Sequence, residues 1–136
     1  MERATAGLRA LGLSFDAIAT SPLARAAETA AIVAARLPDV PAPRELEALE
    51  PDVPAAETLR ALRLFARSRH VLLVGHEPNL GQLLALLLTG SPDGAAIALK
   101  KGACAAVELT ALAPGGGATL RWLLPPRTLR RLGRHG

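Results

Sequence analysis

Val71-Leu-Leu-Val74 runs directly into Gly75-His76-Glu77-Pro78-Asn79. Four consecutive valines and leucines, with no polar residue among them, predict a strand buried on both faces of a parallel sheet. The proline and asparagine that follow favour a helix start, and the apolar stretch after them predicts a largely buried helix that Gly90 ends. A buried strand followed at once by a helix is typical of α/β proteins. It places His76 at the carboxyl end of the strand, where functional groups of open α/β sheets collect.

A second strand-to-helix junction lies at Ser21-Pro22-Leu23-Ala24-Arg25. Residues 15–19 before it are expected to form a short strand, and the helix after it should reach about residue 37. The Ser21 hydroxyl is suited to cap this helix, with the following proline at its first position. Arg25 then falls in the first turn, near free backbone N–H groups and the positive end of the helix dipole, a location that favours a phosphate.

Strands and helices alternate along the rest of the chain. Together they predict an α/β three-layer sandwich with a mostly parallel sheet and an antiparallel edge, in a single domain spanning residues 1–136. The remaining expected elements are an amphipathic helix over residues 1–11, a proline-rich loop with one short extended piece over 38–54, an amphipathic helix over 55–68, strands over 95–99, 105–110 and 119–124, and one helical turn within 125–132.

Composition narrows the class of protein. Half of the residues are hydrophobic but only 2% are aromatic, so the core must be built from leucine, alanine and valine. The net charge of +4 comes mainly from arginine, and much of it sits in the tail at Arg127, Arg130, Arg131 and Arg134. Such a cluster can attract phosphate-rich partners, but no aromatic residues interleave with it as stacking platforms do. We therefore expect a solvated terminal helix or turn, and no nucleic-acid partner.

Several other classes of protein and site are not expected. Cys104 is the only cysteine and lies in an apolar run, so a buried structural thiol is predicted. His70 and His76 lack the spacing of metal ligands, and neither a metal nor a cofactor is expected. The longest apolar run, residues 83–88, is far shorter than the roughly 20 residues that span a bilayer, and the start lacks a signal peptide. A monomeric cytoplasmic protein without membrane contact is predicted.

The motifs together resemble one protein family. Ser-Pro-x-x-Arg25 is followed some fifty residues later by Gly75-His76-Glu77-Pro78, and then by Leu99-Lys-Lys-Gly102 and Trp122-Leu-Leu-Pro-Pro126. This order resembles the histidine phosphatase (phosphoglycerate-mutase-like) superfamily, and most of all its small bacterial phosphohistidine phosphatases of the SixA type. The resemblance covers nearly the whole chain.

The resemblance implies an enzyme that removes phosphate from a histidine of a phosphorylated partner protein. In that family a nucleophilic histidine attacks phosphorus, and water hydrolyses the resulting phosphohistidine. By match to the motifs, Arg25 clamps the phosphoryl oxygens and His76 stabilises their charge in the transition state. Ser21, Gly75 and Glu77 complete the implied substrate-binding residues.

The chain departs from the family at its amino end. Relatives begin with a hydrophobic strand that ends in Arg-His-Gly and carries the nucleophile, whereas Met1 begins downstream of that strand. An N-terminally truncated domain with its first strand missing is therefore expected, and its activity is in question. The chain ends in Arg134-His135-Gly136, but no hydrophobic strand precedes this tripeptide, so coincidence is the preferred interpretation.

Two alternatives to a phosphohistidine phosphatase stay open. The chain could be a catalytically inactive module that binds phosphate or a phosphoprotein through Arg25 and His76. It could also be a small-molecule phosphomonoesterase of the same superfamily, which would need a carboxylic acid to protonate an alkoxide leaving group. Glutamates lie in the loop where such an acid is sought, but none can be assigned; they are Glu45, Glu47 and Glu50.

Overall fold

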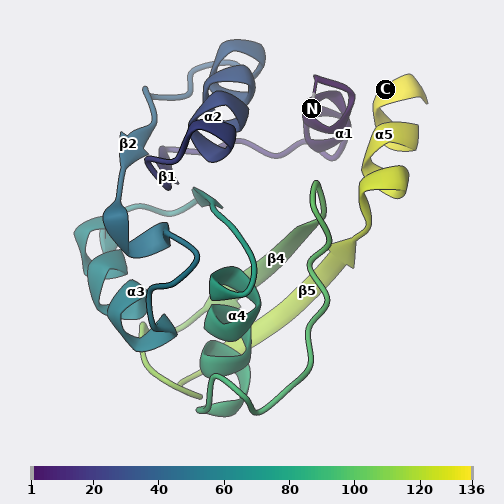
Figure 1. Cartoon of the computed structure of the whole chain (residues 1–136). Helices are drawn as coiled ribbons and strands as arrows, with labels where there is room; N and C mark the ends of the chain where they lie inside the picture. Colours follow the sequence, from purple (N-terminus) through teal and green to yellow (C-terminus); the bar gives the residue numbers. More distant parts are fainter. Residues whose placement is uncertain (1, 136) are drawn as a thin grey trace.

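A computed structural model describes residues 2–135 of the chain (Figure 1). Its elements are, in order, α1 (Glu2–Ala10), β1 (Ala17–Thr20), α2 (Ala24–Arg36), β2 (Arg44–Glu45), the 3-10 turn η1 (Glu47–Leu49), α3 (Ala55–Ala61), the 3-10 turn η2 (Leu62–Phe65), β3 (Val71–Val74), α4 (Asn79–Thr89), β4 (Cys104–Leu109), β5 (Ala118–Leu124) and α5 (Pro126–His135).

The first three strands form a parallel sheet in the order β2-β1-β3. In the pairing of β1 with β3, Ala17 lies opposite Val71 and Thr20 lies opposite Val74. The two strands therefore end level with each other, and the residues that follow them emerge side by side at the carboxyl edge of the sheet.

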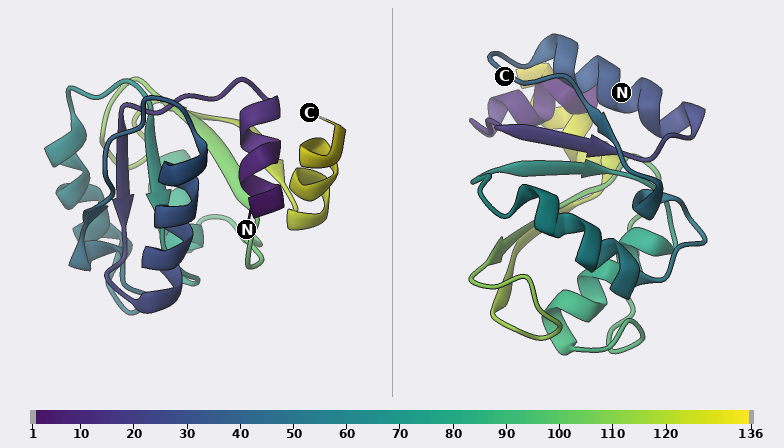
Figure 2. Two further views of the ribbon diagram at one scale, coloured as in Figure 1. Left: turned by 90° about the horizontal axis from the view of Figure 1, so that it is seen from above. Right: turned by 90° about the vertical axis from the view of Figure 1, so that its left-hand side faces the viewer.

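Helices cover both faces of this sheet, as the two views of Figure 2 show. On one face, Leu72 and Val74 pack against a buried cluster of β1 and α2 that contains Ile18 and Val33. On the other face, Leu73 packs against buried side chains of α3 and α4. Alternate residues of β3 thus face opposite helix layers. The expected α/β three-layer arrangement is confirmed.

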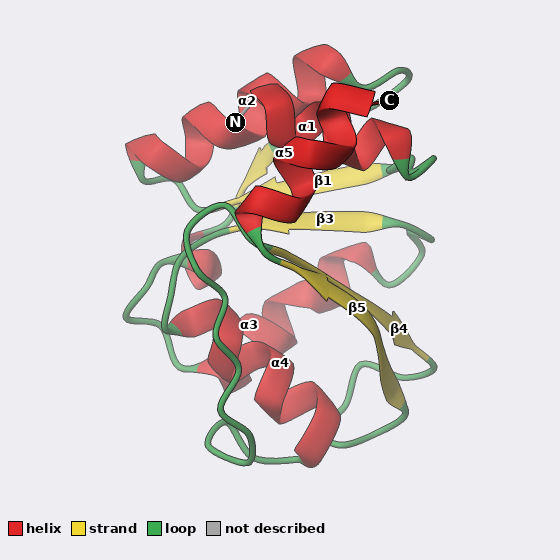
Figure 3. Cartoon of the chain, turned by 90° about the vertical axis from the view of Figure 1, so that its right-hand side faces the viewer, coloured by secondary structure: helices red, strands yellow, loops and turns green. Residues whose placement is uncertain are grey.

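The last two strands form an antiparallel hairpin that is a separate sheet. The glycine-rich connection over residues 110–117 joins them, and the pairing shifts between Ala106 and Val107. Leu129 of α5, with Ala4 and Leu8 of α1, packs on Trp122 of this hairpin. Figure 3 shows α1 and α5 close together, and the hairpin on the side of β3 away from β1. The antiparallel edge is confirmed, but within residues 2–135 no strand joins it to the parallel sheet.

The predicted burial of β3 is confirmed only in part, because side chains pack on both of its faces but do not bury the strand completely. All four residues from Val71 to Val74 are only half-buried. The physical reason is that β3 pairs with β1 on one edge only, and no strand among residues 2–135 pairs with its other edge. The apolar side chains are covered by helices above and below but not from the side.

Several element boundaries also differ from the predictions. Residues 95–99 form no strand, because the turns around Pro92 and Gly94 leave them as a mostly exposed loop. The helix predicted over 55–68 is α-helical only to Ala61 and continues as a 3-10 turn. The tail forms a ten-residue helix rather than a single turn. Helix α4 ends at Gly90 as predicted, where φ is 89°.

The amino ends of β1 and β3 are fastened by Asp16. Its carboxylate accepts backbone N–H bonds from Arg69 and His70, both at 2.9 Å, and its own N–H donates to the His70 carbonyl at 2.9 Å. These two N–H donors hold the pKa of the Asp16 carboxyl below its usual 3.8. The clamp fixes the register of the two strands from the end opposite to Ser21 and His76.

We predict that Asp16→Asn lowers stability at neutral pH, because an amide has one carbonyl oxygen and leaves one N–H without its acceptor. A depressed folded-state pKa contributes stability above the unfolded value of about 3.9, and this contribution disappears as pH falls through the lower folded value. Urea unfolding of both proteins at about pH 7 and about pH 2 measures the difference. A gap of the same size at both pH values would contradict the assignment.

Candidate active site

Ser21 and His76 meet where β1 and β3 end. His76 Nε2 and Ser21 Oγ lie 2.9 Å apart in a hydrogen bond that links residues 55 positions apart in sequence. The Ser21 N–H donates to the Val74 carbonyl at 2.9 Å, which extends the strand pairing by one step. Ser21 is completely buried and His76 is half-buried. The imidazole is therefore fixed in position while part of it stays accessible.

The predicted capping role of Ser21 is wrong. Helix α2 begins at Ala24, its cap residue is Leu23, and no side chain caps it. The Ser21 N–H still takes part in the strand pairing, so helix α2 begins only at Ala24, two residues after the predicted start at Pro22. Its hydroxyl instead accepts the N–H of Leu23 at 3.2 Å and bonds to His76. The serine thus connects the start of α2 to the imidazole.

Arg25 is the second residue of α2 and is exposed. The ion pairs within residues 2–135 do not include Arg25. No hydrogen bond among these residues joins Arg25 to Ser21 or His76. Its guanidinium is left at the amino end of a 13-residue helix, whose dipole favours an anion.

Gly75 is required for space rather than for a left-handed turn. Its φ is not among the positive φ values of the described residues. A Cβ at this position would lie 3.1 Å from the Leu49 carbonyl oxygen and 3.4 Å from Leu80 Cγ. The glycine therefore lets the segment around Leu49 approach the backbone next to His76.

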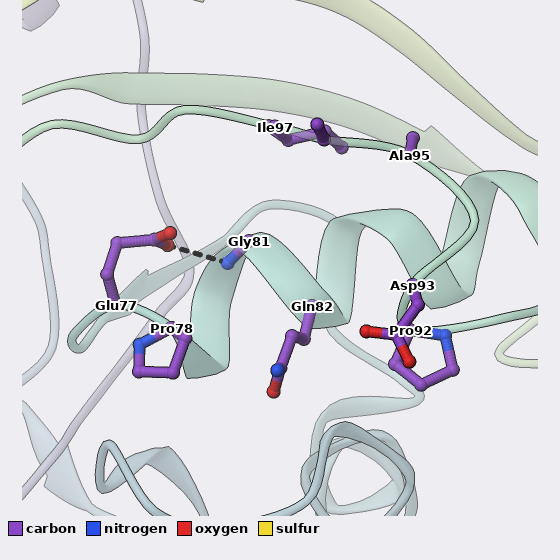
Figure 4. Close-up of a pocket in the computed structure, with 9 residues that line it drawn as sticks. Glu77, Pro78, Gly81, Gln82, Pro92, Asp93, Ala95 and Ile97 are labelled. Atoms are coloured by element: carbon purple, nitrogen blue, oxygen red, sulfur yellow. Dashed lines mark hydrogen bonds between the residues drawn. The ribbon is translucent and has the colours of Figure 1, made fainter.

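Glu77, the residue after His76, lines a surface groove. Its carboxylate accepts the N–H of Gly81 at 2.7 Å, within the first turn of α4, and the Glu77–Pro78 peptide bond is cis. Figure 4 shows this bond and the 91–97 loop across the groove, which has a volume of about 300 Å³ and is also lined by Gln82 and Asp93. A Cβ on Gly81 would lie 3.1 Å from the Ile97 carbonyl oxygen. The contribution of this loop was missed from sequence because the segment was predicted as a strand.

Asn79 is a second feature that the sequence did not predict. It is completely buried at the start of α4, and its Nδ2 donates to the Val53 carbonyl and to Thr58 Oγ1, both at 2.8 Å. The Thr58 hydroxyl donates in turn to the Ala48 carbonyl at 2.6 Å. Asn79 Oδ1 has no hydrogen-bond partner among the described residues. This network ties the 48–53 segment to the helix that follows His76.

The glutamates considered as acids lie in β2 and around η1, and none of them is assigned a catalytic role. Glu45 lies in β2 opposite Thr20, while Glu47 begins η1 and Glu50 follows it. No hydrogen bond between described residues joins any of them to His76.

The other candidate groups lie elsewhere. Burial raises the pKa of the Cys104 thiol to about 11, so it stays protonated near neutral pH. Residues 2–135 contain no cluster of three or more histidine, cysteine, aspartate or glutamate side chains able to hold a metal ion. Within the same span, every helix is too short or too polar to cross a membrane.

Comparison with known proteins identifies the fold. A solved structure of the protein histidine phosphatase SixA complexed with tungstate superposes on this chain with a TM-score of 0.75 and 25% sequence identity. The match covers 94% of this chain and 80% of that protein. The chain has a histidine phosphatase fold. No family model matches the sequence, and no curated protein matches it. The phosphatase resemblance drawn from the motifs of Arg25 and His76 is thus confirmed at the level of the fold.

We predict that Asn79→Ala destabilises this histidine phosphatase fold by about 1–3 kcal/mol, because the buried Thr58 hydroxyl and the Val53 carbonyl both lose their donor. Gln82→Ala is the matched control, because Gln82 lies on the same helix, is half-buried, and bonds through its backbone N–H to the Pro78 carbonyl, a bond that the substitution keeps. Urea unfolding at neutral pH measures both. If the two variants lose the same stability, the network does not hold the 48–53 segment.

Proposed function

We propose that residues 1–136 are the phosphate-binding part of a protein-phosphohistidine phosphatase. The observation that carries this proposal is the 2.9 Å bond between Ser21 and His76, which fixes an imidazole beside the start of α2. The structural neighbour with the same fold is a protein histidine phosphatase complexed with tungstate. Tungstate is a tetrahedral oxyanion like phosphate, so the neighbour supports an oxyanion site in this fold.

Each group has a separate task in the proposed site. The Arg25 guanidinium pairs with two phosphoryl oxygens through its planar fork of donors. The N–H groups at the start of α2 add the positive end of the helix dipole. His76 donates a hydrogen bond to a third oxygen and stabilises charge there, while Ser21 holds its ring. Binding therefore needs no metal ion.

The nucleophile is proposed to come from outside these residues. His70 is exposed and sits at the amino end of β3, opposite to the site, and the side chain of His135 is not described. We infer that an added strand carries the nucleophilic histidine and lies between β3 and the β4–β5 hairpin. The unpaired edge of β3 and its half-buried apolar residues support this position. A fifth of the neighbour's chain has no counterpart in these residues, which is consistent with an additional segment.

The proposed reaction has two steps. The imidazole nitrogen of the added strand attacks phosphorus of a protein phosphohistidine, and the P–N bond of the substrate breaks. The leaving imidazole takes up a proton. Water then attacks the phosphohistidine formed on the enzyme, releasing inorganic phosphate and the free nucleophile. Most of the catalysis is positioning and charge stabilisation, since phosphoryl transfer needs little covalent help from the protein.

The proposed substrate class rests on the leaving group of the reaction and on the surface groove lined by Glu77. An imidazole leaves readily, so the reaction does not require the carboxylic acid that phosphate esters need. The groove beside Glu77 is shallow and bordered by an exposed loop, which suits a phosphate carried on a protein.

An inactive binding module is the second candidate for the 136 residues by themselves. The observation that favours it is that His76 is the only imidazole placed at the carboxyl ends of β1 and β3 among the side chains the structure describes. Such a module would bind phosphate or a phosphoprotein without turnover.

We predict that Arg25→Ala weakens tungstate binding at least about tenfold, which is about 1.4 kcal/mol, because a charge-assisted contact is lost. Calorimetric titration of the 136-residue chain with tungstate measures the affinity. The control variant is Arg63→Ala, which removes another exposed arginine, far from the site in sequence. This variant should bind tungstate as tightly as the parent chain. Unchanged affinity in Arg25→Ala removes this residue from the site.

Turnover separates the two candidate functions. We predict that the 136-residue chain releases no phosphate from a phosphohistidine protein, and that a polypeptide extended at the amino end by an apolar strand ending in Arg-His does. In the extended protein His76→Ala should lower turnover at least about a hundredfold, as loss of one charge-stabilising donor does. Turnover by the 136-residue chain that His135→Ala abolishes would contradict the added strand, and inactivity of the extended, folded protein would favour the binding module.

A further inference from the structure

Helix α5 carries a row of arginines on its outer side. Arg127, Arg130, Arg131 and Arg134 follow the spacing i, i+3, i+4, i+7, which places them on one face of a helix. All four are exposed, and together they line a surface groove of about 240 Å³. We call this surface the arginine row.

The arginine row is not balanced by acidic groups. Within residues 2–135 the two ion pairs are Arg36 with Glu2 and Arg121 with Glu108, and α5 contains no acidic residue. The chain has 16 basic and 12 acidic residues, so the row equals its whole excess of positive charge. The other 12 basic residues are equal in number to the 12 acidic ones, so the row alone matches the formal net charge of +4.

The arrangement is unfavourable for the helix by itself. Like charges three and four residues apart on a helix repel each other and destabilise it. Arg127 also lies in the first turn, at the positive end of the helix dipole. An acidic partner along the row would relieve both effects. The four arginines destabilise α5 by themselves, so binding such a partner would explain why they are there.

The opposite side of α5 is fixed against α1. Leu129 is 2% exposed and packs with Ala4 and Leu8. A Cβ on Gly7 would lie 2.1 Å from the Leu129 carbonyl oxygen, and one on Gly133 would lie 2.3 Å from the Arg3 carbonyl oxygen. The two helices thus approach so closely that only glycine fits, and the row is presented on a rigid support.

The geometry points to a docking surface for an acidic segment of another protein. Each guanidinium offers a planar fork matched to a carboxylate. The row rises about 10 Å along the axis from Arg127 to Arg134, the length of about two helical turns of a partner. Carboxylates spaced over two turns of a partner helix would face all four guanidinium groups. This surface is distinct from the oxyanion site and does not depend on the function proposed for it.

Other polyanions fit the surface less well. A membrane-binding helix inserts apolar side chains, but those of α5 are turned toward α1 and the hairpin. Single-stranded nucleic acid stacks its bases on aromatic rings. The aromatic residues of the chain are half-buried in the three core clusters, away from the row; they are Phe15, Phe65 and Trp122.

The test uses a fluorescent glutamate-rich helical peptide as the acidic probe, with the complete 136-residue chain. One variant replaces the four arginines of the row by glutamine, and a matched control replaces Arg60, Arg63, Arg67 and Arg69, which are equally exposed. Glutamine keeps the helix propensity of arginine. Anisotropy titrations at about 0.05 M and about 0.15 M salt are expected to show at least a tenfold loss of affinity for the row variant. The control should change by less than about twofold.

Three outcomes would overturn the proposal. Equal losses in the two variants would mean that the probe responds to net charge alone. Tighter binding to single-stranded DNA, or to vesicles of phosphatidylserine and phosphatidylcholine, than to the peptide would mean a different class of partner. Absence of saturable peptide binding would also exclude the surface.

Circular dichroism checks that the row variant is folded, and the double variant Arg131→Gln with Arg134→Gln repeats the comparison with a smaller change. Tungstate affinity should stay unchanged in every variant, so a failure here leaves the oxyanion site intact.

Discussion

The parallel pairing of β1 with β3 is the constraint on which the site depends. Because Thr20 lies opposite Val74, the residues just beyond the two strands come together, and Ser21 can bond to His76. A slip of one residue would turn every side chain of β3 to the other face and separate this pair. The register is held at both ends, by Asp16 at one and by the Ser21 N–H at the other. The geometry of the site is therefore set by the register of β1 and β3.

The sequence predicted those parts whose signals are local. The valine and leucine run fixed the bounds of β3, and Gly90 marked the end of α4 because a helix commonly stops at a left-handed glycine. The strand-to-helix junctions that carry Arg25 and His76 were also predicted, while the functional role of the two residues stays a prediction. These signals need only a few neighbouring residues, so one sequence was enough to see them.

What could not be predicted depends on contacts across the chain. Ser21 was read as a helix cap, since a serine before a helix usually is one, and nothing local announces that its hydroxyl meets an imidazole 55 positions away. The buried role of Asn79 rests on Val53 and Thr58, which reach it from a different segment. The need for glycine at position 75 comes from the Leu49 carbonyl. Each of these is a tertiary contact that overrides or adds to a local preference.

The difference between the predicted and the observed burial of β3 is informative. A strand of four aliphatic residues without alternation suits the middle of a sheet, where both edges are paired and both faces are covered. In residues 2–135 this strand occupies an edge, and an unpaired aliphatic edge is a template for another strand. Natural proteins usually protect such edges with charge, proline or a bulge, and β3 has none of these. Its sequence is thus suited to an environment with one more neighbour than the described residues provide. The half-buried side chains of β3 and the separate hairpin across from it indicate where that neighbour would lie. In the proposed function, the same position sets the added histidine next to His76, so one further strand would account both for the unpaired edge of β3 and for the single imidazole among the described side chains at the ends of β1 and β3.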